Sequence, residues 1–316
     1  MASARVHLAS ADLKSARLVL SDAQRQSNRD PQRTIAVARL YQRAFAPELA
    51  IGVLEQLIAA RPDVVGARLE LAALLGRHNR FAEAQRQIDT VLEASPDNPS
   101  AMLLRGDIRM AQRKPAVAAG IYSRVLEIEP RPEVVVALAR AKLAAGRDDE
   151  ALRALEAWHA AHPQDVAVAA VLADHLRNRG DLERARMLYE ELAQLLPDNA
   201  VIQNNLANLL LGSDFEGALI AAQRAYAIAP ENPAVLDTLG FILVQVGELE
   251  SGLARLREAL ARDQDSALIR FHLGIALQEY GSGQAARNQL ERALELGLPV
   301  SQREQAESRL VLLPAS

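Results

Sequence analysis

The histidines are the first residues to consider for chemistry, because the chain has six of them and no cysteine. His159 and His162 form an HxxH pattern, and two histidines three residues apart on a helix could share a face and hold a metal ion. Asp165 is the one further ligand nearby, and His162 stands beside Pro163 at an expected helix end. We therefore expect structural or solvated histidines here, and no metal site.

Sequence patterns of known catalytic sites are also missing. The chain contains neither GxxxxGK[ST], which cradles phosphates, nor GxSxG, which presents a nucleophilic serine. Gly281-Ser282-Gly283 is typical of a turn. Asp174 and His175 are adjacent and so point in different directions on a helix, which rules out a catalytic pair. These absences predict a protein that is not an enzyme and uses no cofactor.

The composition narrows the class of protein. Half of the 316 residues are apolar but only 3% are aromatic, so the core must be aliphatic, which suits helix–helix contacts better than sheets. The net charge of −4 gives no bulk attraction to nucleic acid or anionic lipid. No apolar stretch is long enough to cross a bilayer, and residues 1–20 lack the apolar run of a signal peptide. We expect no nucleic-acid partner and no direct membrane insertion.

Prolines recur at intervals of 33 or 34 residues along the chain, at Pro62, Pro96, Pro130, Pro163, Pro197 and Pro230. A small residue stands twelve positions before each of them, at Ala50, Ala84, Ala118, Ala151, Ala185 and Ala218, and Gly252 and Ala286 continue this series. Self-similarity at a fixed period is the signature of a repeat architecture. The phase divides residues 31–298 into eight units.

Each unit is predicted to be a pair of helices. In the seventh unit Leu236, Leu239 and Leu243 form one helical stripe, and a second stripe begins at Leu249. Gly247 lies between the stripes, where a left-handed residue can end the first helix. The same slot holds Gly146, Gly180, Gly281 and Asn79 in other units. We expect the recurring small residues to lie where the two helices cross.

Further signals mark the ends of units and of the array. Asn98 and Asn232 each precede a proline, as expected of an N-cap followed by proline in the first helical position. Residues 1–30 are predicted to be a partial repeat with its helix at Ala11–Gln24. Residues 299–316 are predicted to hold a capping helix at Ser301–Leu313, with Ser301 as its N-cap and a polar outer face.

This pattern resembles the tetratricopeptide repeat (TPR) family over nearly the whole chain. The resemblance implies an all-α fold, a right-handed superhelix or α-solenoid of stacked antiparallel hairpins. The stretch from Asn204 to Leu290 further resembles bacterial TPR proteins of exopolysaccharide secretion and of the PEP-CTERM sorting system, which are often periplasmic lipoproteins. It implies a periplasmic or envelope location if the chain is part of a longer secreted protein, and the bacterial cytoplasm otherwise.

In the family, the first helices of the units line a concave groove that binds a protein or peptide. Carried over by phase, the groove positions give mixed charge in the middle of the chain, at Asp107, Arg140, Asp174 and Arg177. The later positions give amides beside aromatics, at Asn204, Asn205, Asn208, Asp237, Phe241 and Phe271. Amides can bond a peptide backbone and aromatics supply contact area, so we favour the later groove. Asn205 could instead bond a neighbouring helix, and Phe241 could pack between repeats.

These expectations combine into a non-enzymatic scaffold that holds a peptide or a partner helix in its groove, within a bacterial envelope, exopolysaccharide or protein-sorting assembly. Two alternatives stay open. The chain could be a self-assembling structural array, which would make it a homo-oligomer, or a regulatory module excised from a larger protein.

Overall fold

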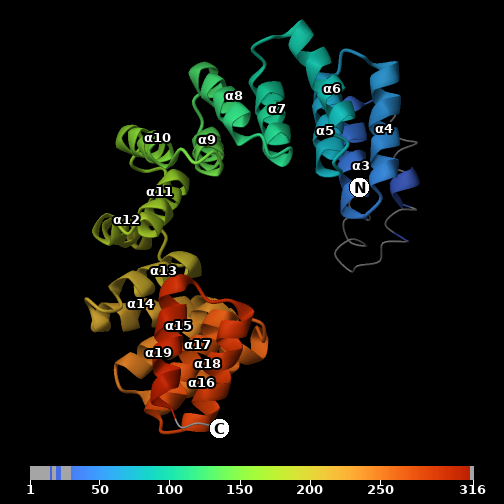
Figure 1. The fold of residues 1–316 in the computed structure, drawn as a ribbon. Helices are drawn as coiled ribbons and strands as arrows, with labels where there is room; N and C mark the ends of the chain where they lie inside the picture. The colour runs from blue at the N-terminus through green and yellow to red at the C-terminus, as the bar shows by residue number, and fades with distance from the viewer. Residues whose placement is uncertain (1–14, 16–18, 23–29, 314–316) are drawn as a thin grey trace. The chain divides into compact units, whose positions relative to one another are not determined.

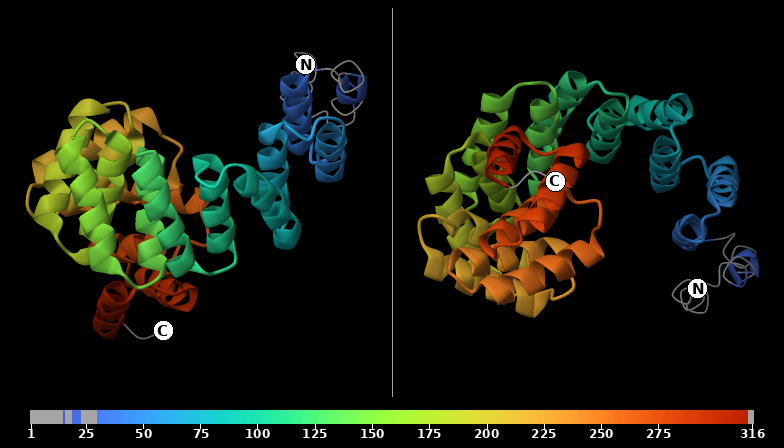
Figure 2. Two further views of the ribbon diagram at one scale, coloured as in Figure 1. Left: turned by 90° about the horizontal axis from the view of Figure 1, so that it is seen from above. Right: turned by 60° about the horizontal axis from the view of Figure 1, so that its bottom comes forward.

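The computed structural model describes Ser15, residues 19–22 and residues 30–313. Within these residues the regular structure is helical, with no strand. The described chain divides into two compact units, the first ending at Ala161 and the second beginning at His162. Within each unit, successive helices pack on their neighbours in sequence as antiparallel hairpins (Figures 1 and 2).

The helices of the first unit are α3 (Pro31–Arg43), α4 (Pro47–Ala60), α5 (Val65–Arg77), α6 (Phe81–Ala94), α7 (Pro99–Ala111), α8 (Pro115–Ile128), α9 (Pro132–Ala144) and α10 (Asp148–Ala161). Those of the second unit are α11 (Val166–Arg179), α12 (Leu182–Leu195), α13 (Ala200–Leu210), α14 (Phe215–Ile228), α15 (Pro233–Gln245), α16 (Leu249–Arg262), α17 (Ala267–Glu279), α18 (Gly283–Leu296) and α19 (Val300–Leu312). Odd-numbered helices from α3 to α17 are the first helices of their hairpins. The predicted all-α solenoid of hairpins is therefore confirmed.

The recurring small residues lie where the two helices of each hairpin cross, as predicted. Each alanine of the series is completely buried, at Ala50, Ala84, Ala118, Ala151, Ala185, Ala218 and Ala286. Gly252 takes this place in α16, and Gly240 faces it from α15. A Cβ at position 240 would lie 3.0 Å from the Gly252 carbonyl oxygen and 2.9 Å from Cγ of Leu256. The crossing of α15 and α16 is thus too close for any larger residue at position 240.

The turn within each hairpin needs a left-handed residue, and the sequence predicted most of them. Gly146, Gly180, Gly247, Gly281 and Asn79 all have positive φ angles. Phe45 and Arg113 occupy the same slot with φ of 51° and 58°, although neither residue type favours this conformation. The close packing of each hairpin, rather than the local residue, therefore sets the turn.

The helix starts follow the predicted capping pattern. The Asn98 side chain accepts a bond from the Ala101 amide at 2.9 Å, and the Asn232 side chain accepts one from the Ala234 amide at 3.0 Å. Pro99 and Pro233 begin the helices that follow. The prolines and asparagines at the phase points thus separate one hairpin from the next.

A terminal helix was predicted at each end of the array, and the structure describes mainly the C-terminal one. Most of the partial repeat predicted over residues 1–30, including most of the helix at Ala11–Gln24, lies outside the described residues. At the other end α19 begins at Val300, so the expectation that Ser301 is its N-cap was wrong. Pro299 occupies the N-cap position, so Ser301 lies within the first turn of the helix, and its hydroxyl donates to Oε1 of Gln302 at 2.8 Å. No helix within the described residues is long and apolar enough to span a membrane.

Candidate partner-binding face

The first helices α13, α15 and α17 of the second unit lie next to one another in the stack. We call the surface that they form the first-helix face. It carries the later groove residues predicted from the sequence. Side-chain contacts between these helices decide which of those residues reach solvent and which do not.

The α13 amides have three different environments. Asn208 is exposed, and its Nδ2 donates to Oγ1 of Thr238 on α15 at 3.1 Å and to the Asn204 carbonyl oxygen at 3.0 Å. Asn204 is half-buried, and its Oδ1 is buried with no hydrogen-bond partner. Nδ2 of Asn205 donates to the Tyr189 hydroxyl at 2.9 Å, so Asn205 ties α13 to α12. Asn208 is therefore the most exposed of the three amides.

Two ties connect the first helices: the Asn208–Thr238 hydrogen bond joins α13 to α15, and a second tie joins α15 to α17. Both carboxylate oxygens of Asp237 lie 2.9 Å from Nδ1 of His272. The ring of Phe241, one turn along α15, stacks on the His272 ring with centroids 4.1 Å apart and an interplanar angle of 15°. His272 was not among the predicted site residues. His272 follows Asp237 by 35 residues, which is one repeat plus about one residue. This spacing places the two side chains on neighbouring first helices at nearly the same level, and it could have predicted the contact.

Two of the predicted groove residues do not offer surface to a partner. Asp237 is 4% exposed and Phe271 is 3% exposed. Asp237 turns toward α17 to meet His272, and Phe271 packs in the apolar cluster that contains Leu256 and Leu290. The phase of the repeat correctly placed both residues on first helices. One side of such a helix faces the core, however, so some of its side chains are buried and others are exposed. Phe241 remains half-buried at the edge of the face.

The mixed-charge residues are brought together only in part. In the second unit the Asp174 carboxylate accepts the Tyr189 hydroxyl at 2.6 Å and Nη2 of Arg177 at 3.3 Å. Burial, followed by the bond to Asp174, raises the pKa of Tyr189. Arg140 is exposed on α9 and belongs to the first unit. Asp174, Tyr189 and Asn205 are therefore joined in one chain of hydrogen bonds from α11 through α12 to α13.

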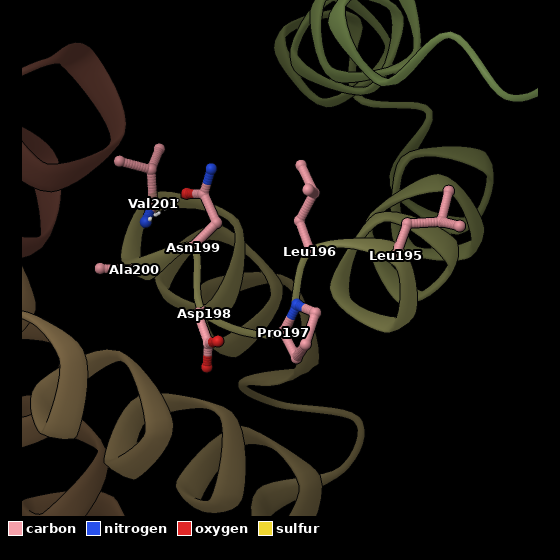
Figure 3. A pocket seen from close by; sticks show the side chains of 7 residues that line it. All are labelled: Leu195, Leu196, Pro197, Asp198, Asn199, Ala200 and Val201. Carbon is pink, nitrogen blue, oxygen red and sulfur yellow. Dashed lines mark hydrogen bonds between the residues drawn. The ribbon is translucent and has the colours of Figure 1, made fainter.

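A shallow depression of about 550 Å³ lies at the turn between α12 and α13 (Figure 3). It is lined by the turn itself, from Leu195 to Val201. The Asn199 side chain is already used, because Oδ1 accepts the amides of Val201 at 3.1 Å and Ile202 at 3.2 Å as the cap of α13. The depression brings together no set of reactive groups.

Metal-ligating side chains do not gather in the part of the chain that the structure describes, where no group of three or more histidine, aspartate or glutamate residues could hold an ion. His159 is half-buried on α10 and His162 follows the last residue of that helix. The pair is thus divided between a helix and the turn after it.

Comparison with known proteins gives the class. A family model described as tetratricopeptide repeat matches residues 69–132 and 172–233, and a second model of the same description matches residues 109–174. Together the matches run without a gap from residue 69 to residue 233, just over half of the chain. The chain belongs to the tetratricopeptide repeat family.

Among curated proteins, the chain is similar to cellulose synthase operon protein C of Pseudomonas fluorescens (strain SBW25), with 27% identity over 239 residues, 73% of this chain and 16% of that protein. Cellulose synthase 2 operon protein C of Komagataeibacter xylinus is 26% identical over 268 residues, 75% of this chain and 20% of that protein. TPR repeat-containing protein PA4667 of Pseudomonas aeruginosa is 25% identical over 205 residues, 62% of this chain and 35% of that protein. The chain thus spans about a third or less of the length of these relatives.

Solved structures agree on the fold. A chain of the APC/C hetero-tetramer Cut9–Hcn1 matches 95% of this chain and 59% of its own length, with a TM-score of 0.58 and 14% identity. Yeast Tom70 matches 86% of this chain and 60% of its own length, with a TM-score of 0.52 and 15% identity. At these identities the likeness concerns the fold alone.

Proposed function

We propose that this chain is a non-enzymatic scaffold that holds an extended segment or a helix of a partner protein on the first-helix face. The observation that carries the proposal is the pair of ties across that face, from Asn208 to Thr238 and from Asp237 to His272. They fix α13, α15 and α17 relative to one another. A surface that is already ordered loses little conformational entropy when a partner binds.

The exposed groups on this face suit a polypeptide ligand. Nδ2 of Asn208 is occupied by Asn204 and Thr238, and because this residue is exposed, its Oδ1 can accept a hydrogen bond from a backbone N–H of the partner. Phe241 is half-buried and held flat against His272, and so offers aromatic contact area in one orientation. An acceptor beside a fixed ring is a suitable arrangement for an extended segment.

We further propose that the partner is a component of a bacterial polysaccharide synthesis or export assembly. The names of the curated relatives from Pseudomonas fluorescens and Komagataeibacter xylinus, which belong to cellulose synthase operons, support this assignment. The protein-sorting assembly expected from the sequence has no such support among these relatives.

The proposal can be tested with a photo-crosslinking amino acid placed at position 208 in the full chain, expressed in the host bacterium. We expect crosslinks to a defined partner of the polysaccharide machinery, identified by mass spectrometry, and their loss when Phe241→Ala is added. The matched control carries the crosslinker at Ile220, an exposed position on the second helix α14. Equal capture at positions 208 and 220, or no capture at 208, would refute the binding face.

A further inference from the structure

A tyrosine–aspartate pair occurs twice, once in each unit, with nearly the same geometry. The Tyr122 hydroxyl donates to Oδ1 of Asp107 at 2.7 Å, and the Tyr189 hydroxyl donates to Oδ1 of Asp174 at 2.6 Å. In both pairs the aspartate lies on the first helix of a hairpin and the tyrosine, fifteen residues later, lies buried on the second. The two pairs can therefore be compared position by position.

The pairs differ in how the negative charge is balanced. Asp174 has Arg177 one turn later at 3.3 Å, whereas the residue one turn after Asp107 is Met110. The nearby cations on α7 are directed elsewhere, since Arg105 bonds Asp89 and Arg109 bonds Gln85 and Gln112. Across residues 30–313 no lysine, arginine or histidine forms an ion pair with Asp107, so its charge lacks an internal counterion.

Asp107 also lines a hollow of about 260 Å³ between α5 and α7, within the first unit. The walls are mostly apolar and come from Ala73, Gly76, Leu104, Ile108 and Ala111. Ala73 and Gly76 leave the space open because they have almost no side chain. Arg77 lies at the rim, but its Nη2 donates to Oε1 of Gln42 at 2.6 Å and so is directed toward α3. Asp107 is thus the charged group that the hollow offers to a ligand.

We propose that this hollow binds a lysine side chain of a partner protein, with its ammonium group at the Asp107 carboxylate and its aliphatic stem between α5 and α7. The ammonium is a compact charge on a flexible four-carbon stem, which fits an apolar passage that ends at one carboxylate. The second carboxylate oxygen of Asp107, an exposed residue, is available as an acceptor. This site lies in the first unit and does not depend on the first-helix face of the second.

The electrostatics of the carboxylate agree with this assignment. Burial raises the pKa of Asp107, and the hydrogen bond from Tyr122 offsets only part of the rise. Partial desolvation disfavours the charged form of the carboxyl group, and the ammonium group of a ligand would favour it. Asp107 nevertheless remains accessible to solvent, and so to a ligand.

The test uses the full chain with labelled methyl groups and two probes, N-acetyl-lysine methylamide and the uncharged N-acetyl-norleucine methylamide. We expect the lysine probe to shift the methyl signals of Leu104, Ile108 and Ala111, and to bind about fivefold more tightly than the norleucine probe. This preference should fall as salt is added, because salt screens an accessible ion pair. Asp107→Asn keeps an acceptor for Tyr122 and should reduce the preference to nothing.

Two controls keep the result interpretable. Asp174→Asn alters the matching pair in the second unit and should leave the preference unchanged. Ala111→Leu fills the hollow from its exposed rim and should abolish binding of both probes while the thermal melting profile stays that of a folded protein. Equal binding of the two probes, shifts confined to other helices, no binding at all, or a preference that survives Asp107→Asn would overturn the proposal.

Discussion

At the scale of single residues, the two aspartates that accept a tyrosine hydroxyl show how one neighbour changes the role of a carboxylate. Asp174 forms an ion pair with Arg177, whereas Asp107 accepts its tyrosine hydroxyl without an ion-paired cation among the described residues. The raised pKa of Asp107 means that the folded state holds its proton more tightly than the unfolded chain does. The contribution of Asp107 to stability is therefore present below the ordinary aspartate pKa and is lost as the pH rises through the raised value.

We predict that Asp107→Asn slightly raises the melting temperature at pH 7, because the variant has no partly desolvated charge without an internal counterion. The gain should shrink as the pH falls toward about 3.5, where the wild-type carboxyl is itself mostly protonated. Thermal unfolding followed by circular dichroism at both pH values measures this change. Asp174→Asn is the matched control and should lower the melting temperature at pH 7, because it weakens the attraction to Arg177.

At the scale of helices, the tightest crossing is built from glycine on both sides. Gly240 on α15 and Gly252 on α16 face each other, and neither can accept a Cβ without moving backbone or the Leu256 and Val244 side chains. Glycine inside a helix costs about 1 kcal/mol relative to alanine. The close approach of α15 and α16 offsets this cost through packing, and it also sets the position of Asp237 and Phe241 on the same helix.

We predict that Gly240→Ala destabilises the protein by about 1–3 kcal/mol, the usual cost of forcing extra volume into a packed contact. Gly120→Ala is the matched control, since Gly120 is an exposed glycine within α8 whose added Cβ would meet nothing within 4 Å. That control should gain up to about 1 kcal/mol from helix propensity alone. Urea unfolding of the two variants measures both values. A destabilised Gly120→Ala, or an unchanged Gly240→Ala, would contradict the packing argument.

At the scale of the whole molecule, the chain is a series of hairpins in which each helix packs mainly on its neighbours in sequence. The second unit contains complete apolar clusters of its own, and both ties of the first-helix face lie within it. In repeat proteins stability is close to a sum over units and their nearest neighbours. The candidate binding face should therefore not need the first unit in order to form.

We predict that residues 162–316, expressed alone, fold into a helical protein that unfolds cooperatively. The dependence of its unfolding free energy on urea should be about half that of the full chain if the full chain unfolds in one step, because this dependence scales with the surface exposed. Circular dichroism with urea titration measures it. A fragment with little helical signal, or with a gradual loss of signal, would show that the first unit is required.

The repeat architecture follows from the sequence because it rests on local and periodic signals. Prolines every 33 or 34 residues mark the boundaries, alanine or glycine at one fixed position allows the helices to cross, and glycine or asparagine ends the first helix. Phe45 and Arg113 show the limit of such local signals, because packing of the hairpin imposes a left-handed turn that their residue types do not predict. Ser301 shows the same limit at a helix start, because its residue type predicts an N-cap but α19 begins one residue earlier, at Val300.

The phase of the repeat also determined which of the candidate groove residues, from Asp107 to Phe271, lie on the first helices. Only the tertiary structure decided what each one does there. It buries Phe271, pairs Asp237 with His272, joins Asn205 to Tyr189, and leaves Asn208 exposed and Phe241 half-buried. It also opens the hollow beside Asp107. The reason is that periodicity fixes the helix on which a residue lies, whereas exposure depends on side chains that reach across from neighbouring helices.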